Sequence, residues 1–164
     1  MKSVGDVIAA LDRAPAIVIP LVRQADPAVL KRRPPSGKWS IHEHACHLAV
    51  VNPRFMQRLE LMLTQDNPAI KSYEPGRYDP DDAMLKLDLD EALDRFARDR
   101  AAMVARLRTL GPRDWDRKGD HDEYNSYSVY IMFRHVALHD FLHAYRIEEL
   151  LLRRDWPIGT DLAG

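Results

Sequence analysis

Two histidines near the C-terminal end occupy positions where a helical pattern calls for apolar residues. His139 and His143 lie four residues apart in a segment whose inward stripe otherwise includes Val136 and Ile147. Side chains at i and i+4 lie on one face of a helix, with Cβ atoms about 6 Å apart. Because zinc–nitrogen bonds are about 2.1 Å long, two imidazoles at this spacing can bind one ion. The pair therefore predicts a divalent metal site that faces the core.

A third inward-facing histidine, His47, belongs to an earlier helical segment. Metal ions in bundle cores are commonly bound by side chains from facing helices. Three protein ligands leave a coordination position for water or substrate, which is typical of a catalytic site. His44 or His135 as a fourth ligand would instead close the site into a structural one. Spacing alone leaves two further alternatives open: His135 in place of His143 as the ligand, and histidines that only make hydrogen bonds in the core.

Four segments with the period of amphipathic helices must position these side chains. They are expected at about 4–24, 40–66, 89–110 and 126–156. Ser40 and Glu43 fit the S-x-x-E capping box that begins the second segment. Pro15 and Pro20 are expected to bend or break the first, because proline lacks an N–H and crowds the preceding turn.

The remaining segments predict connections rather than strands. Residues 67–87 and 114–127 contain several prolines, glycines and polar residues and are expected to be irregular. A connection as long as 67–87 often crosses a bundle or covers a site. We therefore expect a single domain over residues 1–164, all-α, folded as a four-helix bundle with long connections between helices two and three and between helices three and four.

Composition argues against several classes of protein. Lys+Arg total 24 and Asp+Glu total 25, for a formal net charge of -1, and the two signs are interleaved, so no basic surface for nucleic acid is expected. No apolar stretch is long enough to span a bilayer. The N-terminus lacks a signal-peptide pattern, and the single cysteine, Cys46, cannot form an internal disulfide. The expected location is the cytoplasm.

Two motifs resemble the signatures of one protein family. The stretch WSIHEHACHL at 39–48 is similar to the W-S-x-x-E-x-x-x-H-L motif of DinB-like (YfiT-like) proteins. The stretch HDFLHAYRI at 139–147 is similar to the closing H-D-x-x-H-x-x-Q-I motif of the same family. The resemblance implies a four-helix bundle that holds one divalent ion, zinc or nickel, on His47, His139 and His143, and it excludes His135 as a ligand.

The resemblance also implies an activity. The activity that it favours is transfer of a small-molecule thiol (bacillithiol, mycothiol or glutathione) to an electrophile, with the thiolate activated on the metal. A metal-dependent hydrolase or isomerase is the alternative within the enzymes. Two alternatives are not enzymes: a metal-binding bundle of the stress response, and a bundle whose histidines are a relic and no longer bind metal. A homodimer is expected.

Other residues are candidates for substrate contacts or for contacts with the metal ligands. Arg146 stands where the family has glutamine; pointing inward it would suit an anionic substrate, but an outward, solvated side chain is the simpler expectation. Arg100 lies on an apolar helical stripe, so it either pairs with a carboxylate or substrate anion or extends to solvent. His121 is expected near the mouth of the site or, more simply, on the surface. His44 and His135 flank the ligands.

Overall fold

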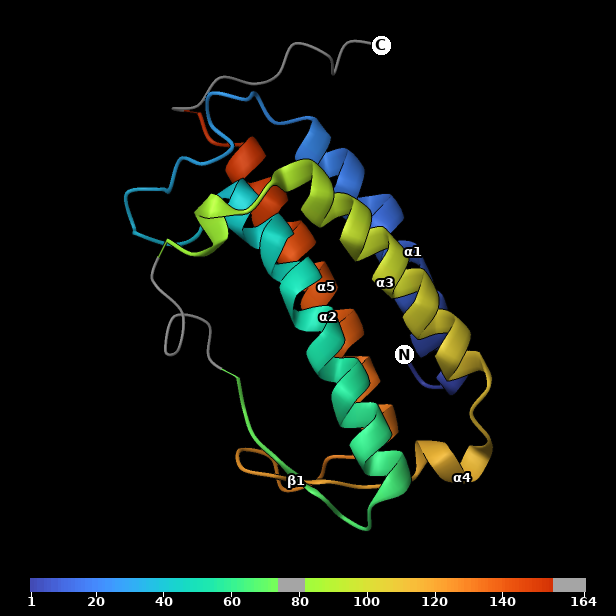
Figure 1. Cartoon of the computed structure of the whole chain (residues 1–164). Helices are drawn as coiled ribbons and strands as arrows, with labels where there is room; N and C mark the ends of the chain where they lie inside the picture. Colours follow the sequence, from blue (N-terminus) through green and yellow to red (C-terminus); the bar gives the residue numbers. More distant parts are fainter. Residues whose placement is uncertain (74–81, 155–164) are drawn as a thin grey trace.

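Long helices account for most of the chain in the computed structural model, which describes residues 1–73 and 82–154. The α-helices in this part are α1 (Val4–Arg23), α2 (Ile41–Thr64), α3 (Leu89–Arg108), the short α4 (Pro112–Trp115) and α5 (Val129–Leu151). A 3₁₀-helix, η1 (Met84–Lys86), precedes α3. The four long helices form a bundle (Figure 1), so the predicted fold class is confirmed. Among the described residues, no helix combines the length and hydropathy that a membrane span requires.

Polar caps fix where the long helices begin. Ser3 and Ser40 each form a full capping box, in α1 and α2 respectively, and Ser128 caps α5 through the amide of Ile131. These caps satisfy amide groups that have no partner within the helix. The register of α2 and α5, and with it the direction of each histidine, is therefore set at the first turn.

The first helix is continuous through both of its prolines. Pro15 and Pro20 lie inside α1. Of the predicted bend or break at these positions, the break is wrong. Val18 and Val22 are buried on either side of Pro20 and pack in the core. This tertiary packing holds the helix together despite the missing hydrogen bonds.

The order of helices around the bundle differs from their order in the chain. Both α1 and α2 pack against α3 and α5, so α1 and α2 lie at opposite corners. Figure 1 shows that α2 and α3 run in the same direction and that α1 and α5 run in the opposite one. As a result α2 and α5 are antiparallel neighbours, and histidines near the start of α2 meet histidines near the end of α5.

A small parallel strand pair lies at the end of the bundle where α2 finishes. Strand β1 (Ala69–Ile70) pairs with β2 (Asp120–His121). The sequence did not predict these strands, since two residues are too few to show a period. Gly119 permits the pairing, because a Cβ there would lie 2.7 Å from Cγ1 of Ile70. The pair ties the loop after α2 to the loop before α5 and so fixes the position of His121.

The interior consists of two apolar clusters with polar residues between them. One cluster includes Ala49 and Ala144, and the other includes Leu59 and Ala137. Between them along the helices lie Asn52 on α2, Arg100 on α3 and Asp140 on α5, all almost completely buried. His47, His139 and His143 lie at the edge of this same level of the bundle.

Candidate metal centre

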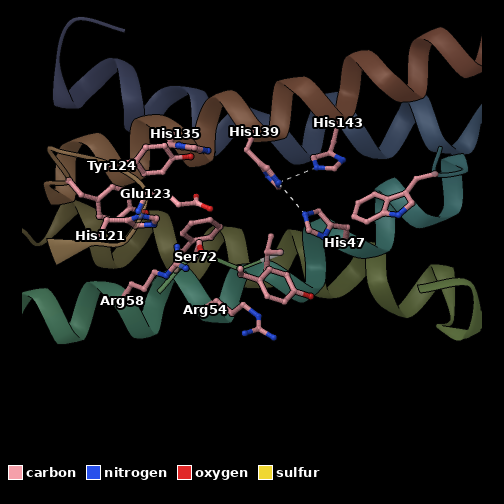
Figure 2. Close-up of a pocket in the computed structure, with 15 residues that line it drawn as sticks. His47, Arg54, Arg58, Ser72, His121, Glu123, Tyr124, His135, His139 and His143 are labelled. Carbon is pink, nitrogen blue, oxygen red and sulfur yellow. Dashed lines mark hydrogen bonds between the residues drawn. The ribbon is translucent and has the colours of Figure 1, made fainter. Parts of the chain in front are cut away.

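The ring nitrogens of three histidines from two helices point at one another. Nε2 of His47 lies 3.1 Å from Nε2 of His139, which in turn lies 3.1 Å from Nε2 of His143. The candidate ligand atoms all fall within 4.8 Å of one another. Figure 2 shows the three rings converging between α2 and α5. The structure thus brings together the three histidines that the sequence analysis named as ligands.

Burial keeps these imidazoles neutral. Desolvation, followed by the neighbouring histidines, lowers the pKa of His47 to about 3. Desolvation is also the main cause that lowers the pKa of His139 to about 4, and it lowers the pKa of His143 as well. Neutral imidazole is the form that binds metal ions. At neutral pH the cluster therefore offers lone pairs rather than positive charges.

The donor set fits a divalent ion. Nε2 of His139 lies within hydrogen-bonding distance of Nε2 of both His47 and His143. A neutral imidazole nitrogen either donates or accepts, so Nε2 of His139 cannot donate to one ring and accept from the other. Tetrahedral ligands at bond lengths of about 2.1 Å are about 3.4 Å apart, close to the two separations of 3.1 Å from Nε2 of His139. Nitrogen ligands of this kind suit zinc, nickel, copper or iron better than calcium or magnesium. Within the described residues, no fourth histidine, cysteine or carboxylate joins the cluster.

The Nδ1 atoms of the three candidate ligands face away from the cluster and differ in their hydrogen-bond partners. Nδ1 of His143 lies 2.8 Å from Nδ1 of His44, so these two rings share a hydrogen bond away from the cluster. Nδ1 of His47 and Nδ1 of His139 are buried without a hydrogen-bond partner. The Trp39 ring packs against His47 and His143, with ring centroids 4.8 and 6.0 Å away. Indole packing therefore holds the His47 ring where hydrogen bonding does not.

A cavity of about 320 Å³ extends from the three histidines along the groove between α2 and α5. The α2 wall runs from His47 to Arg58, and the α5 wall runs from His135 to His143. The loops complete it with Ser72, Tyr73, His121, Glu123, Tyr124 and Tyr127. A volume of this size can hold a small organic molecule. A ligand in the cavity would therefore lie directly beside the imidazole cluster.

Comparison with known proteins gives the family. The model of the DinB superfamily matches residues 10–147. The chain belongs to the DinB superfamily. Over 122 residues it is 30% identical to a protein of Oceanobacillus iheyensis that is named "Putative metal-dependent hydrolase"; the match covers 74% of this chain and 70% of that protein.

A solved structure shows the same fold. YfiT from Bacillus subtilis, described as "a probable metal-dependent hydrolase with an unusual four-helix bundle topology", matches with a TM-score of 0.85. The match covers 96% of this chain and 93% of YfiT at 22% sequence identity. The diagonal placement of the consecutive helices α1 and α2 is thus part of a bundle that a DinB-like relative shares. The name of the Oceanobacillus iheyensis relative and the three-histidine group both support a metal ion in this DinB protein.

The remaining predicted residues fall in three different places. Arg100 is buried and pairs with Asp140 and Asn52, with its guanidinium 2.8 Å from the Asn52 amide oxygen, so it does not extend to solvent. Arg146 points outward and pairs with Glu149 on the surface. Neither side chain lines the cavity that holds the metal centre.

His121, His135 and His44 are not part of the ligand cluster. His121 is 7% exposed and lines the cavity, so the expectation of a surface position is wrong. Its burial comes from the strand pair and from the Tyr127 ring 4.4 Å away, neither of which the sequence pattern revealed. His135 lines the cavity one helical turn before His139. His44 contacts the outer nitrogen of His143 and so does not close the site as a fourth ligand.

The sequence analysis missed several residues of the cavity. Arg54 and Arg58 follow His47 at seven and eleven residues on α2, which places them on the same helical face. That spacing is a signal that could have identified them. Glu123 and Tyr127 lie in a loop, and no periodicity predicts where a loop side chain points. Their place in the wall depends on the path that the strand pair sets.

Proposed function

We propose that this DinB-superfamily protein is a metal-dependent enzyme that activates a small nucleophile at the three-histidine centre. One observation carries the proposal: three neutral imidazole nitrogens converge beside a cavity, and no fourth protein ligand joins them within the described residues. A divalent ion bound there would lower the pKa of a water molecule or a thiol and so supply a nucleophile near neutral pH. A site with three protein ligands and an open position is typical of catalysis.

The residues of this chain would hold and orient the reactants. His47, His139 and His143 hold the ion from two antiparallel helices, and the capped first turns of those helices keep the rings in register. Trp39 packs against two of the rings and excludes water from that side. Burial lowers the pKa of His135 in the wall, so this ring is neutral and able to accept a proton.

The protein's own thiol does not supply the nucleophile. Cys46 is fully buried, and desolvation raises its pKa to about 12. Thiolate is the nucleophilic form of cysteine, so Cys46 is unreactive in the folded protein. A sulfur nucleophile would have to enter the cavity as a cosubstrate. Thiol transfer to an electrophile, which the motifs at 39–48 and 139–147 favour, is therefore the first reaction to test.

Hydrolysis is the second candidate. The relatives from Oceanobacillus iheyensis and Bacillus subtilis are both named as metal-dependent hydrolases, which favours an activated water as the nucleophile. The two reactions share the same ligands and differ in what enters the cavity. Product analysis with and without an added thiol separates them.

The test begins with elemental analysis of untagged protein beside His143→Ala and His135→Ala variants. We expect a near-stoichiometric divalent ion in the wild type and in His135→Ala, and its loss in His143→Ala. The loaded protein is then given an electrophile with a small-molecule thiol, and separately a panel of esters and amides. Absence of metal from the wild type even after reconstitution would overturn the proposal, and retention of metal in His143→Ala would overturn the ligand assignment.

A further inference from the structure

The end of the cavity farthest from the three histidines contains a group of side chains that donate hydrogen bonds. Arg58 lies on the same face of α2 as His47 and eleven residues later, about 16 Å along the helix axis between Cα atoms. His121 and His135 line the same end, from the loop before α5 and from α5 itself. Figure 2 shows Arg58 directed toward the loop that carries His121.

Arg58 has no acidic partner among the described residues. Its guanidinium donates to the backbone oxygen of Lys71 and forms a hydrogen bond with the Tyr127 side chain. Neither partner carries a negative charge at neutral pH. A guanidinium has five N–H groups in a planar fork, so donors remain for a ligand. Within residues 1–73 and 82–154, no carboxylate therefore neutralises this half-buried cation in the cavity wall.

The tautomer of His121 adds a second donor. The Glu123 amide donates to Nδ1 of His121 at 3.1 Å, so neutral His121 carries its proton on Nε2. Asp122 lies 3.5 Å from the same Nδ1, but its carboxylate accepts the Ser72 amide at 2.8 Å. Burial and the nearby charge of Arg58 lower the pKa of His121 and of His135, so both rings stay neutral. His121 therefore presents an N–H rather than a lone pair.

The charged side chains in the described part of the wall favour a negatively charged ligand. Among the described residues that line the cavity, Arg54 and Arg58 are positive and Glu123 is negative, which leaves a net charge of +1 when the histidines are neutral. Arg54 lies over the Tyr73 ring at 3.9 Å, at the rim. Glu123 is exposed and forms no ion pair with either arginine. The two arginines therefore favour an anionic group such as a carboxylate at this end of the cavity.

We propose that the end of the cavity formed by Arg58, His121 and His135 binds a carboxylate of the substrate. The cavity's other wall residues include Phe55, Tyr73 and Tyr124, so the body of the ligand lies against aromatic rings. That the ligand is a substrate, with its reacting group toward the three histidines, rests on the proposed function of the metal centre. The anion site itself does not depend on it.

Binding of a matched pair of probes tests the inference. 3-Phenylpropionate and its neutral amide differ only in charge, and calorimetry measures the affinity of each for protein as purified, with the metal content determined on the same sample. We expect the carboxylate to bind at least about tenfold more tightly than the amide, as for a charge-assisted hydrogen bond. Arg58→Gln should abolish this preference and Arg58→Lys should reduce it.

Controls separate the arginine from the metal and from general surface charge. Arg108→Gln removes an equal charge at an exposed pair with Asp12, far from the cavity wall, and should keep the preference. Two results would overturn the inference: equal binding of the two probes by the wild type, or a preference that persists in Arg58→Gln. Because the readout is loss of preference on changing Arg58, it can succeed or fail independently of whether metal or turnover is found.

Discussion

His44 differs from the three candidate ligands in the nitrogen it uses. Its Nδ1 contacts Nδ1 of His143 at 2.8 Å, while Nε2 of His143 faces the cluster. Burial lowers the pKa of His44 to about 4, so the ring is neutral and can accept a hydrogen bond from His143. A ligand imidazole whose outer N–H is bound in this way is held in one tautomer and one orientation. His44 is thus a positioning residue for His143.

Substitution of His44 should weaken metal binding without removing a ligand. We expect His44→Ala to lower the affinity for zinc by about tenfold or more, as for other partners of metal-bound histidines. His44→Gln, whose amide oxygen can still accept from Nδ1 of His143, should recover part of the loss. Competition with a chromogenic chelator measures the affinity of each variant.

His135 supplies the matched control for this measurement. It is also a histidine beside a candidate ligand and lines the cavity, but it makes no hydrogen bond to the cluster among the described residues. His135→Ala should bind zinc as the wild type does. Equal losses in His44→Ala and His135→Ala would show that the His44–His143 contact has no special role.

At the residue scale, helical spacing was enough to predict most of the candidate metal ligands. It placed His139 and His143 on one face of a helix and His47 on a facing helix, and in the structure the ring nitrogens of all three lie close together. It could not choose between His135 and His143, because both lie four residues from His139. The family motif made that choice. The contact from His44 depends on the crossing of α2 and α5, which periodicity does not define.

At the scale of the helices, the start of α2 combines two kinds of contact at one carboxylate. Glu43 accepts from the backbone amide and the hydroxyl of Ser40, at 2.9 and 2.8 Å. It also pairs with the Arg33 guanidinium from the preceding loop. Burial alone would raise the pKa of Glu43, but the hydrogen bonds from Arg33 and Ser40 outweigh it and lower the pKa below 4.5. This turn of α2 leads into His44 and His47.

The lowered pKa predicts a pH-dependent contribution to stability. A group whose pKa is lower in the folded state stabilises that state at pH values above its unfolded pKa, and the effect is lost as pH falls through the folded pKa. Glu43→Gln should therefore lower the free energy of unfolding at pH 7 by about 1–2 kcal/mol, and the difference should shrink below about pH 4. Urea unfolding of both proteins across this range measures the gap. A gap that is constant with pH would contradict an ionised Glu43 as its source.

The helices could be predicted closely because local residues define their ends. Ser40 and Ser128 cap α2 and α5 near the expected positions. The sequence-based prediction of secondary structure was wrong where contacts between residues distant in the chain outweigh local sequence preferences. Packing of Val18 and Val22 keeps α1 intact around Pro20, and β1 pairs with a partner about 50 residues away in the chain. No local pattern carries information of either kind.

At the scale of the whole molecule, a buried polar group divides the core. Arg100 on α3 donates to the Asp140 carboxylate on α5 and to the Asn52 amide oxygen on α2. Arg100 and Asp140 are each almost completely buried, and apolar clusters lie above and below them. Asp140 follows the candidate ligand His139 directly in α5. The ion pair therefore joins three helices at the level of the metal centre.

Breaking this ion pair should be costly. Asp140→Asn leaves the buried Arg100 charge without its counterion, so we expect a loss of about 3–5 kcal/mol in the free energy of unfolding. The double variant Arg100→Met/Asp140→Leu removes both charges and should lose much less. Glu60→Gln, which breaks the exposed pair with Arg106, is the surface control and should cost roughly 0–1 kcal/mol. Urea unfolding that gives equal losses for Asp140→Asn and Glu60→Gln would contradict a structural role for the buried pair.

Metal binding should stabilise the bundle as a whole, because the ligands come from both α2 and α5. An ion that binds only the folded state raises the free energy of unfolding by RT ln(1 + [L]/Kd), which is about 2.7 kcal/mol at a free concentration of 100 Kd. For a domain of this size we expect the melting temperature of metal-depleted protein to rise by roughly 5–10 °C on addition of zinc. Scanning calorimetry measures the shift, and His143→Ala should show little or none. A shift of equal size in His143→Ala would place the stabilising ion elsewhere, whereas a shift confined to the wild type would tie the three histidines to the stability of the fold as well as to its proposed chemistry.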